Sequence, residues 1–85
     1  MNVLIPTPLR DYTGERQVVA HGATLRDVLT ELDLRFPGIR FRMIDEQGRM
    51  RAHMRFFVNG RAVHDLGVAL ADTDELAIVQ ALSGG

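Results

Sequence analysis

Residues 24–38, TLRDVLTELDLRFPG, carry the clearest pattern of secondary structure in the chain. Five apolar residues in and beside it recur at spacings of three or four positions: Leu25, Val28, Leu29, Leu32 and Phe36. This spacing places them on one face of an α-helix. Thr24 is a favourable N-cap with Asp27 at the capping-box position, and Pro37-Gly38 ends the pattern. The sequence therefore predicts a helix over about residues 25–35 with one apolar face to bury.

Short apolar runs on both sides of this helix predict strands at residues 3–5, 16–20, 54–58, 61–63 and 75–80. Gly14-Glu15 predicts a hairpin between the first two strands, and Asn59-Gly60 predicts another between the third and fourth. In residues 39–43 apolar residues alternate with arginines, which predicts a short strand or an irregular turn. Asp72-Thr73-Asp74 predicts a turn before the last strand. The order β-β-α-β-β-β predicts an α+β fold, with a mixed sheet of four to five strands on one main helix.

The composition of the 85 residues excludes several classes of protein. Hydrophobic residues make up 46% and charged residues 25%, which is typical of one globular domain and not of a disordered chain. The absence of cysteine excludes a disulfide framework, a thiolate nucleophile and a Cys-ligated zinc or iron–sulfur centre. No apolar run approaches the roughly 18 residues that span a membrane, and the first residues, MNVLIPTPLR, lack a signal-peptide pattern. We therefore expect a cytoplasmic protein with no membrane partner.

All ten basic residues are arginines, and they are unevenly placed. Six of them lie in residues 40–61 against two acids, whereas residues 62–85 hold four acids and no arginine. The arginine-rich segment also contains Phe41, Phe56 and Phe57, a combination that can bind nucleic acid. The net charge is only -1 and no RNA-binding or DNA-binding motif is present, so we expect no nucleic-acid partner.

No residue pattern predicts a metal site or a catalytic centre. The three histidines have no ligand spacing and no accompanying cysteine. Asp72, Asp74 and Glu75 lack the length and alternation of a calcium-binding loop, which favours a solvated turn. Ser83 has no His–Asp pattern around it, which argues against a serine nucleophile.

Five segments carry recognisable motifs in a fixed order: Ile5-Pro6-Thr7-Pro8-Leu9-Arg10, Gly22-Ala23-Thr24-Leu25, Phe57-Val58-Asn59-Gly60, Asp74-Glu75-Leu76-Ala77-Ile78-Val79 and Ala81-Leu82-Ser83-Gly84-Gly85. Each is weak alone, but together they cover nearly the whole chain. In this order they resemble the MoaD/ThiS group of ubiquitin-like β-grasp sulfur carriers. The resemblance implies a β-grasp domain at residues 1–80 and a flexible carrier tail at residues 81–85.

The resemblance also implies a chemistry for the tail. The carboxylate of Gly85 would be adenylated by an E1-like enzyme of the MoeB/ThiF type, and a sulfur donor would then convert it to a thiocarboxylate. Gly84 would let the tail enter an enclosed active site, because glycine has no Cβ. ATP and Mg²⁺ would belong to the partner enzyme, and this chain would bind no cofactor. The chain would thus be a carrier, or a non-catalytic subunit of a sulfur-transferase complex, and not an enzyme.

The pathway stays open between several carriers of this group. The opening segment, residues 5–10, resembles carriers used in cysteine biosynthesis, with a cysteine synthase homologue as sulfur acceptor. The molybdopterin-synthase small subunit, which donates sulfur within a complex with its large subunit, usually has prolines where this chain has Gln80-Ala81-Leu82. Thiamin and secondary-metabolite pathways are further alternatives. Two other function classes also remain: a protein modifier conjugated through Gly85, and a β-grasp binding module that is never activated.

The sequence offers four candidate residues for partner binding. Phe56 and Phe57 are adjacent on a predicted strand, so their side chains point to opposite faces of the sheet. One belongs in the core and the other could contact a partner, and the sequence does not say which. Leu82 and Ser83, on the predicted tail, are the other two candidates.

Overall fold

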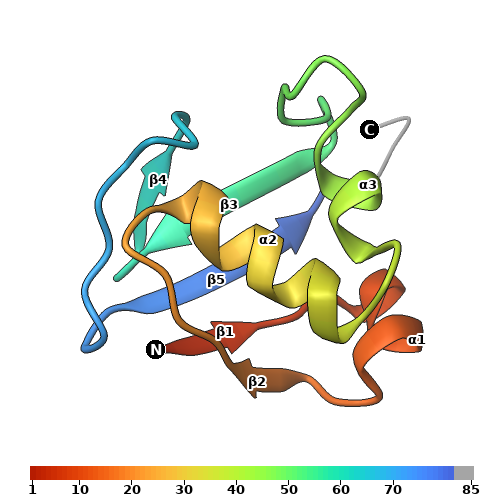
Figure 1. The fold of residues 1–85 in the computed structure, drawn as a ribbon, viewed down its shortest axis with the longest axis horizontal. Helices are drawn as coiled ribbons and strands as arrows, with labels where there is room; N and C mark the ends of the chain where they lie inside the picture. Colours follow the sequence, from red (N-terminus) through yellow and green to blue (C-terminus); the bar gives the residue numbers. More distant parts are fainter. Residues whose placement is uncertain (82–85) are drawn as a thin grey trace.

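The computed structural model describes residues 1–81. Its centre is a five-stranded sheet in the order β2-β1-β5-β3-β4. The strands are β1 (Asn2–Leu4), β2 (Gln17–Val19), β3 (Met54–Val58), β4 (Arg61–Val63) and β5 (Glu75–Gln80). β1 and β5 are parallel and the other pairs are antiparallel, so the sheet is mixed. The long helix α2 (Leu25–Arg35) crosses one face of this sheet (Figure 1). The predicted α+β architecture is confirmed.

The core lies between α2 and the covered face of the sheet. Alternate strand residues point into it, as the pleat of a strand requires, and Phe56 is the largest of them at 1% exposed. The four residues of α2 that face the sheet are completely buried: Leu25, Val28, Leu29 and Leu32. No polar or charged residue is buried within the described chain. The core is therefore held by apolar burial, at roughly 2 kcal/mol for each large side chain.

The start of α2 explains the Gly-x-Thr-Leu motif in physical terms. The Thr24 hydroxyl accepts a hydrogen bond from the Asp27 amide at 3.2 Å, as the predicted N-cap requires. Two residues earlier the backbone passes very close to the helix. A Cβ added to Gly22 would lie 2.6 Å from the Val28 backbone nitrogen. Only glycine fits this approach without a shift of the backbone.

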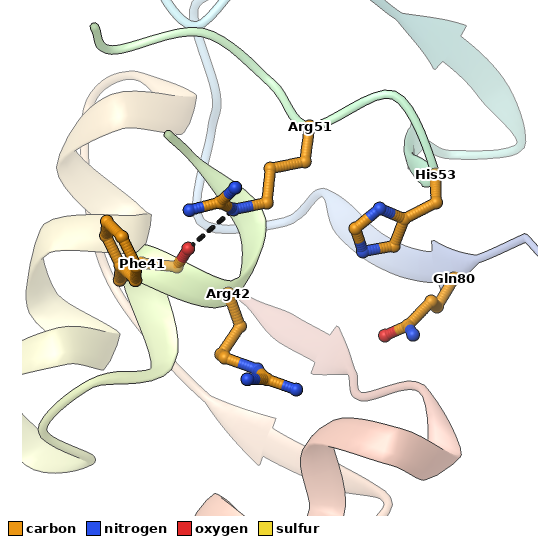
Figure 2. A pocket seen from close by; sticks show the side chains of 5 residues that line it. All are labelled: Phe41, Arg42, Arg51, His53 and Gln80. Atoms are coloured by element: carbon orange, nitrogen blue, oxygen red, sulfur yellow. Dashed lines mark hydrogen bonds between the residues drawn. The ribbon is translucent and has the colours of Figure 1, made fainter. Parts of the chain in front are cut away.

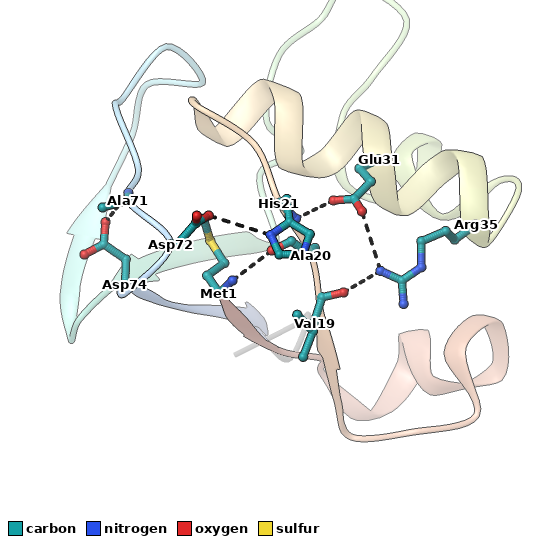
Figure 3. A network of polar contacts seen from close by, with 9 residues as sticks. All are labelled: Met1, Val19, Ala20, His21, Glu31, Arg35, Ala71, Asp72 and Asp74. Atoms are coloured by element: carbon teal, nitrogen blue, oxygen red, sulfur yellow. Dashed lines mark hydrogen bonds and ion pairs between the residues drawn. The ribbon is translucent and has the colours of Figure 1, made fainter.

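Polar contacts join α2 to the edge of the sheet at β2 (Figure 3). The Arg35 guanidinium donates to the Val19 carbonyl and lies 3.9 Å from the Glu31 carboxylate. Glu31 in turn accepts a hydrogen bond from the His21 amide. The His21 ring also lies 3.7 Å from the Asp72 carboxylate, in the turn before β5. All these groups are at or near the surface, so each pair contributes little energy but helps to orient the helix.

The connection between β1 and β2 differs from the predicted tight hairpin at Gly14-Glu15, and that prediction is wrong. The two strands do pair antiparallel, but a 3-10 helix, η1 (Thr7–Leu9), and a short α1 (Arg10–Thr13) lie between them. Leu9 is 1% exposed, and its burial keeps this segment against the core. Gly14 has a φ of 71° and ends α1, instead of forming the corner of a hairpin.

Residues 39–43 form a helix, α3 (Ile39–Met43), and neither the predicted strand nor the irregular turn is correct. Ile39 and Met43 are both fully buried and lie four positions apart, which is the spacing of one helical face. The Asp33 carboxylate accepts hydrogen bonds from the amides of Gly38 and Arg40 at 3.1 Å each. These contacts fix the turn from α2 into α3. No helix in the described part of the chain is long and apolar enough to cross a membrane.

Candidate functional site: the outer sheet face and the base of the tail

β5 fixes the position from which the C-terminal segment leaves the fold. It is hydrogen-bonded on both sides, to β1 and to β3, and Gln80 is in register with Met54. The Ala81 amide then donates to the His53 carbonyl at 2.7 Å. The predicted site residues that follow lie outside the described residues: Leu82, Ser83, Gly84 and Gly85. Their roles, and the division into residues 1–80 and a tail at 81–85, stay predictions.

The structure decides between the two adjacent phenylalanines of β3. Phe56 is 1% exposed and packs in the core, whereas Phe57 is half-buried on the other side of the sheet. The prediction that they point to opposite faces is confirmed. A partner can therefore reach Phe57 but not Phe56. That Phe57 contacts a partner stays a prediction.

Phe57 belongs to an apolar strip on the outer face of the sheet, opposite α2. Ala77 lies between Leu4 and Phe57 in the sheet register, and all three are partly exposed. Val79 continues the strip along β5 and is 42% exposed. We call Leu4, Phe57, Ala77 and Val79 the outer-face patch. It ends two residues before Ala81, so a protein that covers it also meets the base of the tail.

Sequence reasoning did not find three members of the outer-face patch. From the sequence we predicted only that Leu4, Ala77 and Val79 belong to strands. The signal was present in β5, where Leu76 and Ile78 alternate with Ala77 and Val79. Four consecutive apolar residues in a strand indicate that both faces of the sheet are apolar at that point. In the structure α2 covers one face of the sheet, and the other face is partly exposed.

A basic pocket lies beside the base of the tail. Five residues line a cavity of about 310 Å³ there: Phe41, Arg42, Arg51, His53 and Gln80 (Figure 2). We call it the arginine pocket. Its residues come from α3, from the segment before β3 and from the end of β5. The sequence showed the excess of arginines in this segment, but not that two of them would line one pocket with Gln80, the last residue of β5.

The acidic turn before β5 has a structural role at the far end of the sheet. The Asp74 carboxylate accepts hydrogen bonds from the Ala71 amide at 2.8 Å and from the Asn59 side chain at 2.9 Å. The hydrogen bond from the Ala71 backbone amide lowers the pKa of Asp74 most, and the hydrogen bond from the Asn59 side chain lowers it further. The predicted turn is confirmed by the hydrogen bond from the Asp74 amide to the Ala71 carbonyl. Within residues 1–81, no group of three or more His, Asp or Glu side chains is placed to hold a metal ion.

The histidines do not form a common site in the structure. His21 and His64 are exposed on different connections, and His53 is partly buried in the arginine pocket. The arrangement thus offers an open apolar face and a basic pocket, both leading to the C-terminal segment.

Comparison with known proteins assigns this arrangement to a family. The sulfur carrier protein CysO of Mycobacterium tuberculosis is 35% identical over 91 residues, which cover all of this chain and 98% of CysO. A chain in the crystal structure of the Amycolatopsis orientalis BexX/CysO complex superposes with a TM-score of 0.90 at 34% identity, covering 99% of this chain and 98% of that one. SAMP1 of Haloferax volcanii superposes with a TM-score of 0.82 at 32% identity, covering 100% and 98%. The ThiS family model matches residues 3–85, and the chain therefore belongs to the ThiS family.

Proposed function

We propose that this protein is a sulfur carrier whose Gly85 carboxylate is converted to a thiocarboxylate and then donates sulfur in a biosynthetic pathway. The observation that carries the proposal is full-length similarity to the sulfur carrier CysO, together with the Gly84-Gly85 ending. The fold supports it, because β5 and the hydrogen bond from the Ala81 amide to the His53 carbonyl fix the point at which the C-terminal segment begins. The location in the cytoplasm stays a prediction.

The chemistry requires a partner enzyme, because a free carboxylate is a poor electrophile. The Gly85 carboxylate would attack the α-phosphate of ATP, forming an acyl-adenylate and releasing pyrophosphate. Hydrosulfide would then attack the acyl carbon and displace AMP, which leaves the thiocarboxylate and one proton. An E1-like enzyme of the MoeB/ThiF type would supply ATP, Mg²⁺ and the catalytic groups. This chain would contribute its terminal carboxylate and its docking surface.

The outer-face patch is the surface that we expect the loading enzyme to cover. Apolar and aromatic side chains are typical of the buried centre of protein interfaces, and Phe57 is the aromatic residue of the patch, beside Ala77 in the sheet register. The same surface would then contact the sulfur acceptor, because both enzymes must reach the same tail. The CysO chain that occurs in a complex with BexX supports binding of this chain to a partner protein.

The acceptor that we favour is a cysteine synthase homologue. The similarity to CysO and the resemblance of residues 5–10 to cysteine-type carriers support it. A molybdopterin-synthase large subunit is the alternative acceptor, and it is less well supported because the prolines typical of that ending are replaced by Gln80-Ala81-Leu82. Sulfur transfer from the loaded chain to each purified enzyme in turn would separate them.

The decisive experiment is intact mass spectrometry after incubation with an E1-like enzyme, ATP, Mg²⁺ and sulfide. The expected result is a mass gain that corresponds to replacement of one oxygen by sulfur. The gain should be absent in a Gly85-deleted chain and strongly reduced in Gly84→Phe, while both variants keep the wild-type circular dichroism spectrum. Normal loading of the Gly85-deleted chain, or no loading of the wild type, would contradict the proposal.

A second candidate function is conjugation to other proteins. Small archaeal modifier protein 3 of Haloferax volcanii is 32% identical over 82 residues, which cover 89% of this chain and 88% of that protein. In this case the activated Gly85 would form an isopeptide bond with a lysine of a target. Covalent adducts that survive denaturation and disappear when Gly85 is deleted would favour the modifier. A chain that is inert with every E1-like enzyme and forms no adducts would instead be a binding module.

A further inference from the structure

We propose that the arginine pocket is a docking site for acidic side chains of the enzyme that loads the tail. The inference rests on the proposed function and adds a second contact region to the outer-face patch. It concerns how the partner is recognised, which is separate from the chemistry at Gly85. Four observations support this proposal: the position of the pocket, the fixed orientation of the Arg51 side chain, the local excess of positive charge, and the exposed aromatic ring of Phe41 in the pocket.

The pocket is placed where a loading enzyme must come close. Gln80, the last residue of β5, forms one wall. The next residue, Ala81, is hydrogen-bonded to His53, which forms another wall. An active site that takes up the residues after Ala81 therefore brings its entrance next to this pocket. Figure 2 shows His53 and Gln80 on one side of the pocket, and Arg42 and Arg51 with Phe41 on the other.

Arg51 is held in position before any partner binds. Its Nε atom donates to the Phe41 carbonyl at 2.7 Å, and its guanidinium carbon lies 4.6 Å from the centre of the Phe41 ring. The stacking and the hydrogen bond restrict the side chain and leave the two Nη atoms for another acceptor. A guanidinium in this state matches a carboxylate with two parallel hydrogen bonds and loses little entropy on binding.

The charge around the pocket favours an acidic partner. Within residues 1–81 the ion pairs are His21–Asp72 and Arg35–Glu31, so neither arginine of the pocket is neutralised there. The Asp45 carboxylate does not line the pocket; it accepts hydrogen bonds from the amides of Gln47 and Arg49, at 3.0 and 2.9 Å, and forms no ion pair with Arg42 or Arg51 within residues 1–81. Positive charge that its own fold leaves uncompensated attracts carboxylates and speeds the encounter with an acidic surface.

Phe41 makes the pocket suitable for the surface of a protein partner and not only for a free anion. Its ring is 56% exposed although it is a large apolar residue, and it lies under the Arg51 guanidinium. Aromatic residues and arginine are enriched together in the buried centres of protein interfaces. We therefore expect Asp or Glu side chains of the partner at Arg42 and Arg51, with an apolar residue of the partner against Phe41.

The test compares two charge reversals at opposite ends of the sheet. Arg42→Glu changes the pocket, and no side-chain hydrogen bond or ion pair of Arg42 is present within the described chain, so the fold should be kept. Arg61→Glu is the matched control: Arg61 is exposed and pairs with Val58, whereas the pocket lies at the other end of β3, where Met54 is in register with Gln80. Loading of both variants is measured with the E1-like enzyme that loads the wild type, which gives KM and kcat. Calorimetric titration of each variant against the same enzyme gives the Kd.

We expect Arg42→Glu to raise the Kd for the enzyme and the KM for loading about tenfold, because it places like charges together, and to leave kcat within about twofold. Arg61→Glu should behave as the wild type. Added salt should weaken binding of the wild type more than of Arg42→Glu. The conservative variant Arg51→Lys should bind less well than the wild type, since lysine cannot form the two-point contact.

The outcomes separate the two proposals. Loading of the wild type with an unchanged Kd and KM for Arg42→Glu would overturn the docking site and leave the carrier function intact. Equal weakening by Arg42→Glu and Arg61→Glu would show a general charge effect and would also overturn it. No loading of the wild type would overturn the carrier function itself. Self-association that is lost in Arg42→Glu would assign the pocket to the acidic residues of a second copy instead.

Discussion

The side chain of Asn59 donates a hydrogen bond to the Asp74 carboxylate at 2.9 Å, although the two residues are 15 positions apart. Asn59 also exchanges hydrogen bonds with Glu75: its side-chain oxygen accepts from the Glu75 amide at 2.9 Å, and its own amide donates to the Glu75 carbonyl at 2.9 Å. The turn between β3 and β4 is thus joined to the first residue of β5. We call Asn59, Asp74 and Glu75 the asparagine clamp. It sets the register of β5 at the end of the sheet opposite to the tail.

We predict that the asparagine clamp contributes measurably to stability. Asn59 has a φ of 50°, so Asn59→Gly keeps the turn while it removes the side-chain hydrogen bonds. The free energy of unfolding should fall by about 1–2 kcal/mol in this variant. In Asn59→Ala the free energy of unfolding should fall further, because alanine adopts a left-handed conformation at a cost of about 1 kcal/mol. Urea unfolding measures both, and wild-type stability of Asn59→Gly would contradict the prediction.

We predict that Asp74 makes the protein sensitive to acid. Its pKa is lowered below the ordinary value of 3.8 by the Ala71 amide and then by Asn59. A carboxyl whose pKa is lowered on folding stabilises the fold above its unfolded pKa, and this contribution is lost as pH falls through the folded pKa. Asp74→Asn should therefore be less stable near neutral pH and lose less stability on acidification than the wild type. Asp72→Asn, in the same exposed turn, is the control, and an equal acid response in both variants would argue against Asp74 as the source.

We predict that Gly22 cannot be replaced without loss of stability. The Cβ of Gly22→Ala would meet the Val28 backbone nitrogen at 2.6 Å, so the backbone must shift. Overpacking of this kind costs about 1–3 kcal/mol. Gly67→Ala is the matched control, because its nearest contact is a side-chain oxygen of Asp65 at 3.3 Å. Melting temperatures should show a clear drop for the first variant and little change for the second, and similar values for both would contradict the prediction.

We predict that a charge placed on α2 destabilises the fold on the buried face of the helix but not on its exposed face. Leu32 is fully buried and Leu34 is 79% exposed, two positions further along the same helix. Leu32→Asp should lower the free energy of unfolding by about 3–5 kcal/mol, because it buries an unpaired charge or polar group. Leu34→Asp should stay within about 0.5 kcal/mol of the wild type. A stable Leu32→Asp variant would mean that the helix does not face the sheet as described.

We predict that Phe57 and Phe56 affect different properties. Phe57→Ser should keep the fold but raise the Kd for the loading enzyme about tenfold or more, because the docking surface loses its aromatic side chain. Phe56→Ala should instead lower the free energy of unfolding by about 3–5 kcal/mol through the cavity that it leaves. Calorimetric titration and urea unfolding separate the two effects. Wild-type affinity of Phe57→Ser would exclude the outer-face patch as the contact region.

Elements with a strong local pattern were predicted closely from the sequence. The bounds of α2, β3, β4 and β5 agree with the predicted residues, because apolar spacing, a cap and the Asn59-Gly60 turn all point to the same structure. The short helices were not predicted. In α3 the alternation of Ile39, Phe41 and Met43 suggested a strand, whereas burial of the first and last on one helical face decides the conformation.

The long helix, most of the strands, the alternation of Phe56 and Phe57 and the resemblance to a sulfur-carrier family could all be predicted from the sequence. All of these depend on residues that are near one another in the chain or on the order of short motifs. Only the folded chain shows that Phe57 is the outward residue, that Asn59 holds Asp74, and that Arg42 and Arg51 line one pocket with Gln80. These relations join distant segments, and they depend on which face of the sheet α2 covers, a choice that local periodicity cannot encode.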